Sequence, residues 1–233
     1  MVTEGRSHSA LLFGGSGFLG AAIAKQLKEK GWLVTTAGHS SNSSADILTS
    51  DLTWPDRLVA AGTQFDAIVW AQGLNAKGSF LESTSSELEE LFEVNVSLIA
   101  RSLRMLVESG LLNSPCRGVV VSSVWQETAR AEKFSYITTK AALAGLVPSI
   151  AIDMGPLGFT INAVLPGVIL SPMSEANLSQ SQLSGVQLAT PGGNLATAQE
   201  VANVVEWLAS PNSRGINSQS IKVDNGWSHS RHV

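Results

Sequence analysis

The stretch F13-G14-G15-S16-G17-F18-L19-G20 lies between a short apolar run and a segment with helical periodicity. Gly15, Gly17 and Gly20 satisfy the pattern G-x-G-x-x-G, which allows a tight turn, close approach of the backbone to a pyrophosphate, and helix–strand packing. The N-terminus of the following helix would offer N–H groups and partial positive charge to phosphates. The stretch predicts a strand, a turn and a helix that bind a dinucleotide. A tight turn with no ligand is the simpler alternative.

Short apolar runs and helical patterns alternate along the rest of the chain. Strands are expected at 9–13, 33–37, 47–51, 66–72, 118–122, 160–165 and 220–223. Helices are expected at 18–30, about 85–110, 135–154 and 198–209, and from 53–55 onward, with a kink at Pro148. The alternation predicts an α/β protein with a doubly wound parallel sheet in three layers, a Rossmann fold. Residues 1–233 form a single domain in this interpretation, and 168–197, where periodicity is weak, form a substrate loop.

Composition excludes several classes of function. The chain has 233 residues, 19 acidic against 15 basic side chains, a net charge of −4, and 44% hydrophobic residues. This balance argues against disorder and against nucleic acid as a partner. One cysteine, Cys116, excludes an internal disulfide, and four scattered histidines lack metal-ligand spacing, so no metal is expected. Prolines and glycines interrupt the weakly charged stretch 141–170, and the N-terminus lacks an apolar signal region. We therefore expect no membrane segment and a cytoplasmic location.

The end of the second expected strand bears on the choice of cofactor. It reads A37-G38-H39-S40-S41 and lacks the carboxylate that holds the adenosine ribose in many NAD-binding folds. A carboxylate there would repel a 2′-phosphate, and His39, Ser40 and Ser41 can donate hydrogen bonds, so the sequence favours NADP(H) over NAD(H). Asp51 either accepts a hydrogen bond from the adenine amino group or caps the helix that begins at 53–55.

Tyr136 and Lys140 occupy one face of a predicted helix, four residues apart. A phenol with a pKa near 10 is a poor acid–base catalyst at neutral pH, and a nearby ammonium favours the phenolate. Ser123 follows the run VVVS at the carboxyl end of its strand, the edge at which open α/β sheets bind ligands. Taken alone, Tyr-x-x-x-Lys is more often a surface pair on an amphipathic helix.

Together these parts resemble the short-chain dehydrogenase/reductase family over essentially the full length. The matching pieces are the glycine loop, Asp51-Leu52, Ala71-Gln72-Gly73, Asn95-Val96, Val121-Ser122-Ser123, Tyr136-Ile-Thr-Thr-Lys140, Asn162-Ala-Val-Leu-Pro166-Gly167 and Val223-Asp224-Asn225-Gly226. In three places the chain departs from the compact members of that family. Phe13 replaces their threonine, Gly17 follows the glycine spacing of the extended, sugar-nucleotide-modifying members, and W70-A71-Q72-G73 replaces the usual N-N-A-G.

The resemblance implies a set of catalytic roles. Tyr136 is the general acid in reduction and the base in oxidation, Lys140 lowers its pKa and holds the nicotinamide ribose, and Ser123 binds the substrate oxygen. Asn95 positions a water that links Lys140 to solvent. The implied cofactor-binding residues are Gly14, Ser16, Gly17, Phe18, Leu19, His39, Ser40, Asp51, Leu52, Ala71, Gln72, Gly73, Tyr136, Lys140, Pro166, Gly167, Val168, Ile169 and Ser171.

The expected function is interconversion of a ketone and a secondary alcohol by hydride transfer, with 3-oxoacyl thioesters and small or ring ketones as comparable substrates. Trp125, Gln126, Phe134, Leu74 and the loop 171–190 would face the substrate, and this loop carries no charged anchor. The resemblance also implies a homodimer or homotetramer joined through the long helical region and the Tyr136 helix. The alternatives are a dinucleotide-sensing regulator without chemistry and a sugar-nucleotide epimerase or dehydratase.

Overall fold

The computed structural model describes residues 7–39 and 45–230. Within these ranges the chain forms one seven-stranded parallel sheet in the order β3-β2-β1-β4-β5-β6-β7. The strands are β1 (Ser9–Phe13), β2 (Leu33–Gly38), β3 (Ile47–Leu48), β4 (Phe65–Trp70), β5 (Leu112–Val121), β6 (Phe159–Pro166) and β7 (Ser220–Val223). The strand order reverses direction between β1 and β4, and this is the point at which doubly wound sheets bind ligands. The doubly wound α/β fold is confirmed.

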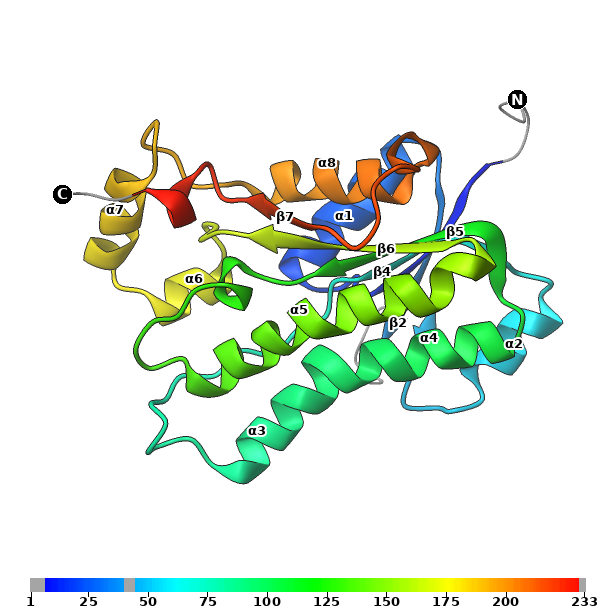
Figure 1. The fold of residues 1–233 in the computed structure, drawn as a ribbon, viewed down its shortest axis with the longest axis horizontal. Coiled ribbons are helices and arrows are strands. Elements are labelled where there is room, and N and C mark those ends of the chain that lie inside the picture. The colour runs from blue at the N-terminus through cyan, green and yellow to red at the C-terminus, as the bar shows by residue number, and fades with distance from the viewer. Residues whose placement is uncertain (1–6, 40–44, 231–233) are drawn as a thin grey trace.

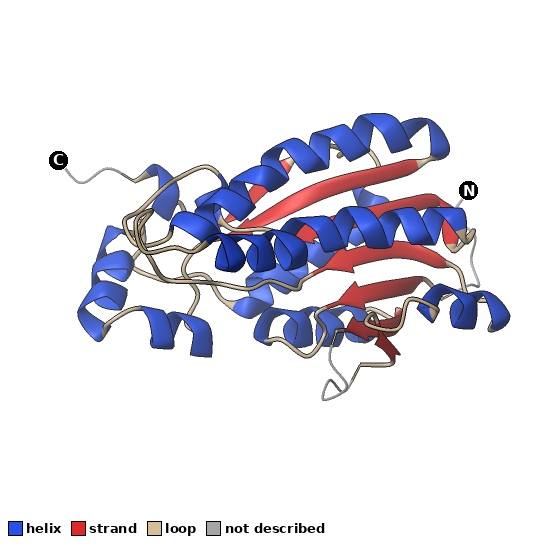
Figure 2. Cartoon of the chain, turned by 90° about the horizontal axis from the view of Figure 1, so that it is seen from below, coloured by secondary structure: helices blue, strands red, loops and turns tan. Residues whose placement is uncertain are grey.

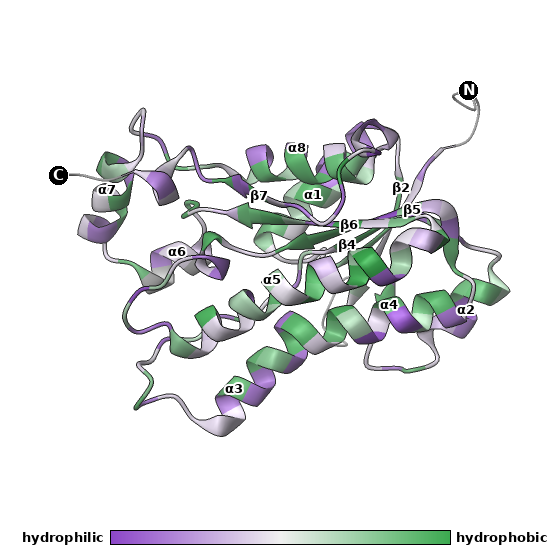
Figure 3. Cartoon of the chain, in the orientation of Figure 1, coloured by the Kyte–Doolittle hydropathy of each residue, from purple (hydrophilic) through white to green (hydrophobic). Residues whose placement is uncertain are grey.

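Helices cover both faces of this sheet (Figure 1). On one face lie α1 (Phe18–Glu29) and α8 (Ala198–Ala209), whose apolar side chains, such as Ile23 and Val205, pack on the strands. On the other lie α2 (Trp54–Ala60), α4 (Leu98–Glu108) and α5 (Phe134–Met154), with Leu103 and Val147 in the core. Figure 3 shows the most hydrophobic residues along the central strands, as expected for parallel strands that are covered on both sides. The three layers are thus α/β/α.

A long, bent helical region precedes β5. It consists of α3 (Ser85–Phe92), a π-helical turn at Glu93–Ser97 and α4. Figure 1 shows α3 and α4 running beside α5. The sequence predicts one helix over about 85–110, and its overall extent is right. The π turn contains Asn95, and π turns inside α-helices often occur at functional sites.

The departure from the family pattern at Phe13 has a packing explanation. The register pairs Phe13 with Ala37 on β2 and with Trp70 on β4. Its ring stacks on Trp70 with centroids 6.1 Å apart and meets Trp54 of α2 edge to face at 6.1 Å. All three side chains are buried, and Trp70 Nε1 donates to Ser102 Oγ at 2.9 Å. An aromatic cluster therefore stands where a threonine and an asparagine are expected.

Several expected boundaries are wrong. The strand expected at 47–51 is limited to Ile47–Leu48, and β5 begins at Leu112, six residues before the β-branched run. The segment 168–197 is not a plain loop, because it contains α6 (Pro172–Asn177) and α7 (Gln180–Ala189) (Figure 2). Each of these helices begins with a capping box, Ser171 with Ser174 and Ser179 with Gln182, which satisfies N–H groups of its first turn.

Helix α5 continues through Pro148 to Met154, as the sequence predicts. Among the described residues, Phe134–Leu157 is the stretch that is long and apolar enough to span a membrane by length and composition. Leu143, Val147 and Ala151 lie on its inner side and are buried in the core against the sheet. Ile152, by contrast, is 75% exposed. Some of the apolar side chains of α5 thus pack in the core, and others lie on the surface.

Candidate active site

The glycine-rich turn places backbone against backbone at the end of β1. Gly14 has φ +76° and donates its N–H to the Ala37 carbonyl at 3.0 Å, while Gly17 N–H donates to the Gly14 carbonyl at 3.0 Å. A Cβ on Gly20 would lie 2.0 Å from the Gly14 carbonyl oxygen, so only glycine fits there. Helix α1 begins after Gly17, and no side chain caps it. Its first N–H groups are thus available to an anion.

We expect Gly20→Ala to lower the free energy of unfolding by about 3 kcal/mol, because the added methyl group overlaps backbone atoms that cannot turn away. The matched control is Gly17→Ala, where a Cβ meets nothing nearer than 3.4 Å and the stability loss is expected to be about 1 kcal/mol or less. Urea denaturation of both variants measures the difference. Equal losses in the two variants would contradict the close packing of α1 on the turn.

A hollow beside the glycine-rich turn is bordered by a carboxylate that the sequence interpretation missed, that of Asp46. Asp46 Oδ2 accepts from Thr36 N–H at 2.7 Å and from Thr36 Oγ1 at 2.8 Å. It borders a hollow between α1 and β2 together with Gly15, Ser16, Lys25 and Lys28. Asp46 comes eight residues after Gly38, the last residue of β2, so no pattern near residue 38 reveals it. His39 is exposed, and Ser40 and Ser41 lie outside the described residues.

Asp51 is engaged at the start of α2. Its Oδ1 accepts from Thr53 N–H at 3.0 Å and from Thr53 Oγ1 at 2.7 Å, and Arg57 contacts Oδ2 at 2.5 Å. These hydrogen bonds from Thr53, helped by the Arg57 charge, lower the pKa of the Asp51 carboxyl. Asp51 thus bonds to Thr53, the residue that precedes α2, and no side chain among the described residues caps the first turn of this helix. Leu52 beside it is 69% exposed.

Ser123, Tyr136 and Lys140 come together at the carboxyl end of β5. Ser123 follows the strand and is 7% exposed, and its hydroxyl forms a hydrogen bond with the Tyr136 side chain. Lys140 lies one turn further along α5 than Tyr136, and its Nζ is 5.8 Å from the centre of the phenol ring. The ammonium donates to the Val121 carbonyl at 3.3 Å. A phenol, a hydroxyl and an amine therefore share one site.

Burial shifts the pKa values of the phenol and the amine in opposite directions. Burial raises the pKa of Tyr136 above its usual 10, and the Ser123 hydrogen bond opposes this in part. Burial lowers the pKa of Lys140 from 10.5 to about 8. Both shifts follow from the cost of placing a charge in a poorly solvated site. At neutral pH the phenol is protonated and able to donate a hydrogen bond or a proton.

Asn95 is fixed between the loop after β4 and helix α5. Its Oδ1 accepts from Leu74 N–H at 2.8 Å, and its Nδ2 donates to Leu74 O at 3.0 Å and to Thr139 Oγ1 at 2.9 Å. A Cβ on Gly73 would lie 3.4 Å from Asn95 Oδ1 and 3.6 Å from Lys140 Nζ. The side chain is buried, and it lies close to the lysine at the inner end of the site.

A cleft opens beside Tyr136 and encloses about 750 Å³, its mouth included. The residues that line it are Phe18, Leu19, Asn75, Ser122, Ser123, Trp125, Arg130, Lys133, Tyr136, Pro166, Gly167, Val168, Ile169, Ser171, Ser174 and Leu178. The cleft thus unites the start of α1, the end of β5, the start of α5 and the segment after β6. Six buried side-chain polar atoms of the described residues have no hydrogen-bond partner, and two of them are Ser122 Oγ, in the wall of this cleft, and Gln72 Oε1.

The residues expected on the substrate side are only partly in the cleft. Trp125 lines it, but the Gln126 amide turns away and donates to Ser220 Oγ at 3.0 Å. The Phe134 ring packs edge to face on Phe80, and Leu74 is bonded to Asn95. None of these three borders the cleft. Arg130 and Lys133, which the sequence interpretation did not include, do border it.

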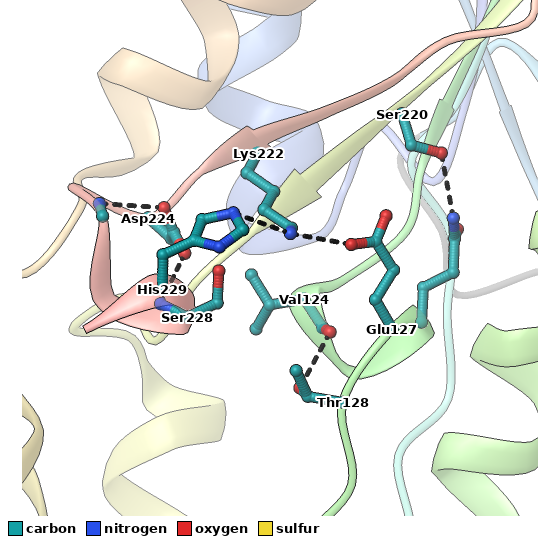
Figure 4. Close-up of polar contacts among 10 residues, drawn as sticks. Val124, Glu127, Thr128, Ser220, Lys222, Asp224, Ser228 and His229 are labelled. Atoms are coloured by element: carbon teal, nitrogen blue, oxygen red, sulfur yellow. Dashed lines mark hydrogen bonds and ion pairs between the residues drawn. The ribbon is translucent and has the colours of Figure 1, made fainter. Parts of the chain in front are cut away.

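The C-terminal segment contacts residues 124–127, which follow β5 (Figure 4). Lys222 Nζ contacts Glu127 Oε2 at 2.7 Å and His229 Nε2 at 3.1 Å. Asp224 accepts from Gly226 N–H at 3.0 Å and Ser228 N–H at 2.9 Å, which closes the turn after β7. Trp227 then meets Trp125 edge to face at 5.5 Å. Residues more than ninety positions apart in the chain thus fix one side of the cleft.

Comparison with known proteins places this fold and this residue order among oxidoreductases. A family model described as enoyl-(acyl carrier protein) reductase matches residues 53–228. The 3-oxoacyl-[acyl-carrier-protein] reductase FabG of Escherichia coli K12 is 27% identical, covering 93% of this chain and 96% of that protein. A short chain dehydrogenase family protein from Francisella tularensis superposes with a TM-score of 0.82 at 21% identity, covering 96% and 100%. A Beutenbergia cavernae structure, with NADP bound at low occupancy, gives 0.82 at 22% identity, covering 96% and 97%.

Proposed function

Since the chain belongs to the short-chain dehydrogenase/reductase family and is an NAD(P)-dependent oxidoreductase of ketones and alcohols, we propose that Tyr136 is its general acid and base. The observation that supports this role is the position of the phenol beside the cleft, hydrogen-bonded to Ser123 and 5.8 Å from the Lys140 ammonium. In reduction the protonated phenol donates its proton to the substrate oxygen, and in oxidation the phenolate accepts it.

The neighbouring residues orient the reacting groups in this proposal. Ser123 holds the substrate oxygen with its hydroxyl, close to the Tyr136 hydroxyl. Lys140 favours the phenolate electrostatically and binds the nicotinamide ribose. Asn95 holds a water beside Lys140, through which the proton that Tyr136 gives up is replaced from solvent. All four groups sit on strand ends or helices, so little reorganisation is needed when the reaction occurs.

The residues around the cleft fit a nicotinamide dinucleotide, which supplies the hydride when bound. Gly14, Ser16, Gly17, Phe18 and Leu19 would hold its phosphates at the start of α1. The nicotinamide would lie against Pro166, Gly167, Val168, Ile169 and Ser171, and Ser122 Oγ offers an unpaired buried polar atom in the same cleft. Ala71, Gln72 and Gly73 would border the middle of the cofactor, and His39, Ser40, Asp51 and Leu52 its adenosine end.

For the choice between the two dinucleotides we propose NADP(H). Lys25 and Lys28 border the hollow on the adenosine side, where their positive charge favours a 2′-phosphate. Asp46 lies in the same hollow, but the two hydrogen bonds from Thr36 occupy its Oδ2. The two lysines at this hollow balance its two carboxylates, those of Asp46 and Glu29. The hollow is therefore less acidic than a site in which a carboxylate binds the two ribose hydroxyls.

We further propose a cytoplasmic homodimer or homotetramer. The surface of α5 carries small and apolar residues, among them Ala141, Ala144 and the exposed Ile152. A face of this kind is usually covered by another chain.

The segment 168–197, with α6 and α7, borders the cleft and forms the substrate loop. Among the two alternatives, a cofactor-sensing regulator would not need the assembled phenol, hydroxyl and amine, and a sugar-nucleotide enzyme is supported only by the spacing of the glycines.

The test is a panel of ketones and aldehydes assayed with NADPH and NADH. We expect oxidation of the reduced cofactor with at least some ketones, a higher kcat/KM with NADPH than with NADH, and tighter binding of NADPH. Tighter binding of NADH would overturn the proposed preference. Cofactor binding without turnover of any carbonyl compound would favour the regulatory alternative.

A further inference from the structure

The cleft wall just before α5 is positively charged. Arg130 and Lys133 both border the cleft, and no aspartate or glutamate is among the described residues that line it. Both cations lie in the segment between the turn Val124–Gln126 and Tyr136. Neither belongs to the glycine-rich turn or to the segment after β6, where the cofactor is placed. This charge therefore lies on the part of the wall that is left for the substrate.

Lys133 is a buried cation close to the reacting groups. Its side chain is 5% exposed, and its Nζ lies 5.7 Å from the centre of the Tyr136 ring. It donates to Asn75 Oδ1 at 2.7 Å and to the Ala76 carbonyl at 3.1 Å, both of which are neutral acceptors. Burial, with the repulsion of Arg130 and Lys77, lowers the pKa of Lys133 to about 8. An anion bound beside these cations would relieve this repulsion.

Arg130 lies over an aromatic ring at the edge of the cleft. Its guanidinium lies 5.9 Å from the centre of the Trp125 ring, and Trp125 packs in turn on Trp227. Glu127, a carboxylate three residues away, is paired with Lys222 on the other side of this segment (Figure 4). A planar guanidinium that is already positioned binds carboxylate or phosphate oxygens in a bidentate fashion at low entropic cost.

We propose that the substrate carries a carboxylate or phosphate group close to its carbonyl, and that Arg130 and Lys133 bind this group. The anion contacts the guanidinium and lies near the buried ammonium while Ser123 and Tyr136 hold the carbonyl oxygen. This inference rests on the proposed function, because it assigns the substrate class of the same cleft. Arg130 and Lys133 would supply the charged group for substrate binding that the loop 171–190 lacks.

The experiment compares pairs of compounds that differ in the anionic group. 3-Oxobutanoate is paired with its ethyl ester, and dihydroxyacetone phosphate with dihydroxyacetone, so that the two pairs distinguish a carboxylate from a phosphate. We measure kcat/KM with NADPH and, independently of turnover, binding to the enzyme–NADP⁺ complex by calorimetry. We expect the anionic member of at least one pair to be preferred by about tenfold or more in both measurements. Equal affinity within both pairs, or no binding of any of the four compounds, overturns the inference.

Variants identify the residue that carries the preference. Arg130→Gln is expected to reduce the ratio of anionic to neutral kcat/KM about ten- to hundredfold, and Arg130→Lys to restore part of it. Arg104→Gln on the exposed face of α4 is the matched control and leaves the ratio unchanged. An unchanged ratio in Arg130→Gln overturns the inference. Anion binding that Arg130→Gln abolishes, without turnover of any carbonyl compound, would contradict the proposed function alone.

Discussion

Tyr136→Phe is expected to lower kcat about 10³-fold or more while the enzyme binds NADPH almost as tightly as the wild type. The substitution removes one oxygen atom and keeps the ring, so the contacts of the ring with Lys133 and Lys140 remain. What is lost is the hydroxyl that we propose as the proton donor to the substrate oxygen, together with its hydrogen bond with Ser123. A loss of turnover without a loss of cofactor affinity is the signature of an interaction that acts in the transition state.

The measurement is steady-state turnover of the best ketone from the panel, together with NADPH binding followed by fluorescence. Thr138→Val is the matched control, since it also removes a hydroxyl from the first turns of α5. The Thr138 hydroxyl donates to the Phe134 carbonyl at 2.8 Å and does not border the cleft, so kcat is expected to stay within about threefold. Undiminished turnover in Tyr136→Phe would refute the assignment of the general acid. A parallel loss of NADPH binding would mean that the ring position itself had changed.

Much of this site was accessible from the sequence because its geometry is local. Tyr136 and Lys140 are four residues apart on a helix, which puts them on one face, and Ser123 follows a strand whose carboxyl end must lie at the binding edge of the sheet. The glycine-rich turn is only partly local. A Cβ on Gly20 would overlap the Gly14 carbonyl, whereas a Cβ on Gly14 would meet the backbone of Gln72, a contact between distant segments. Periodicity predicted the strands β1, β6 and β7 and the helices α1, α5 and α8 to within one or two residues.

The features that the sequence did not reveal depend on contacts between distant segments. Asp46 is held beside the hollow at the glycine-rich turn by Thr36, ten positions earlier, and no pattern at the end of β2 indicates this contact. Arg130 and Lys133 occur in a segment without periodicity, and no sequence pattern indicates their contacts with Trp125 and Asn75. Helices α6 and α7 do not depend on such distant contacts. The capping-box pattern S179-Q-S-Q182 indicates the start of α7 from the sequence alone.

Lys140→Met is expected to abolish turnover and yet to stabilise the protein. A pKa lowered from 10.5 to about 8 corresponds to a cost of about 3 kcal/mol in unfolding free energy at neutral pH, because the folded state must bury an ammonium that water solvates well in the unfolded chain. Methionine fills nearly the same volume without the charge. It gives up the hydrogen bond to the Val121 carbonyl, worth about 1 kcal/mol, so a net gain of about 2 kcal/mol is expected.

The pH dependence of this effect has a definite sign. Between about pH 8 and 10.5 the unfolded chain binds a proton at residue 140 that the folded wild type has released, so the stability of the wild type rises with pH across this window. The stability of Lys140→Met lacks the contribution of residue 140 to that rise, and the difference between the two proteins shrinks above pH 8. Urea denaturation at pH 7, 9 and 10 measures it, with Lys30→Met, at an exposed position, as the control that shows no such trend.

The same ammonium links stability to catalysis. If its charge favours the phenolate and holds the ribose, kcat/KM for ketone reduction by the wild type falls as pH rises through about 8, where the ammonium loses its proton. The charge at residue 140 would then lower the free energy of unfolding and support turnover. Removing the charge raises the free energy of unfolding and abolishes turnover. A Lys140→Met protein that is less stable than the wild type at pH 7 would show that the lysine serves the fold, and the electrostatic role proposed for it would fail.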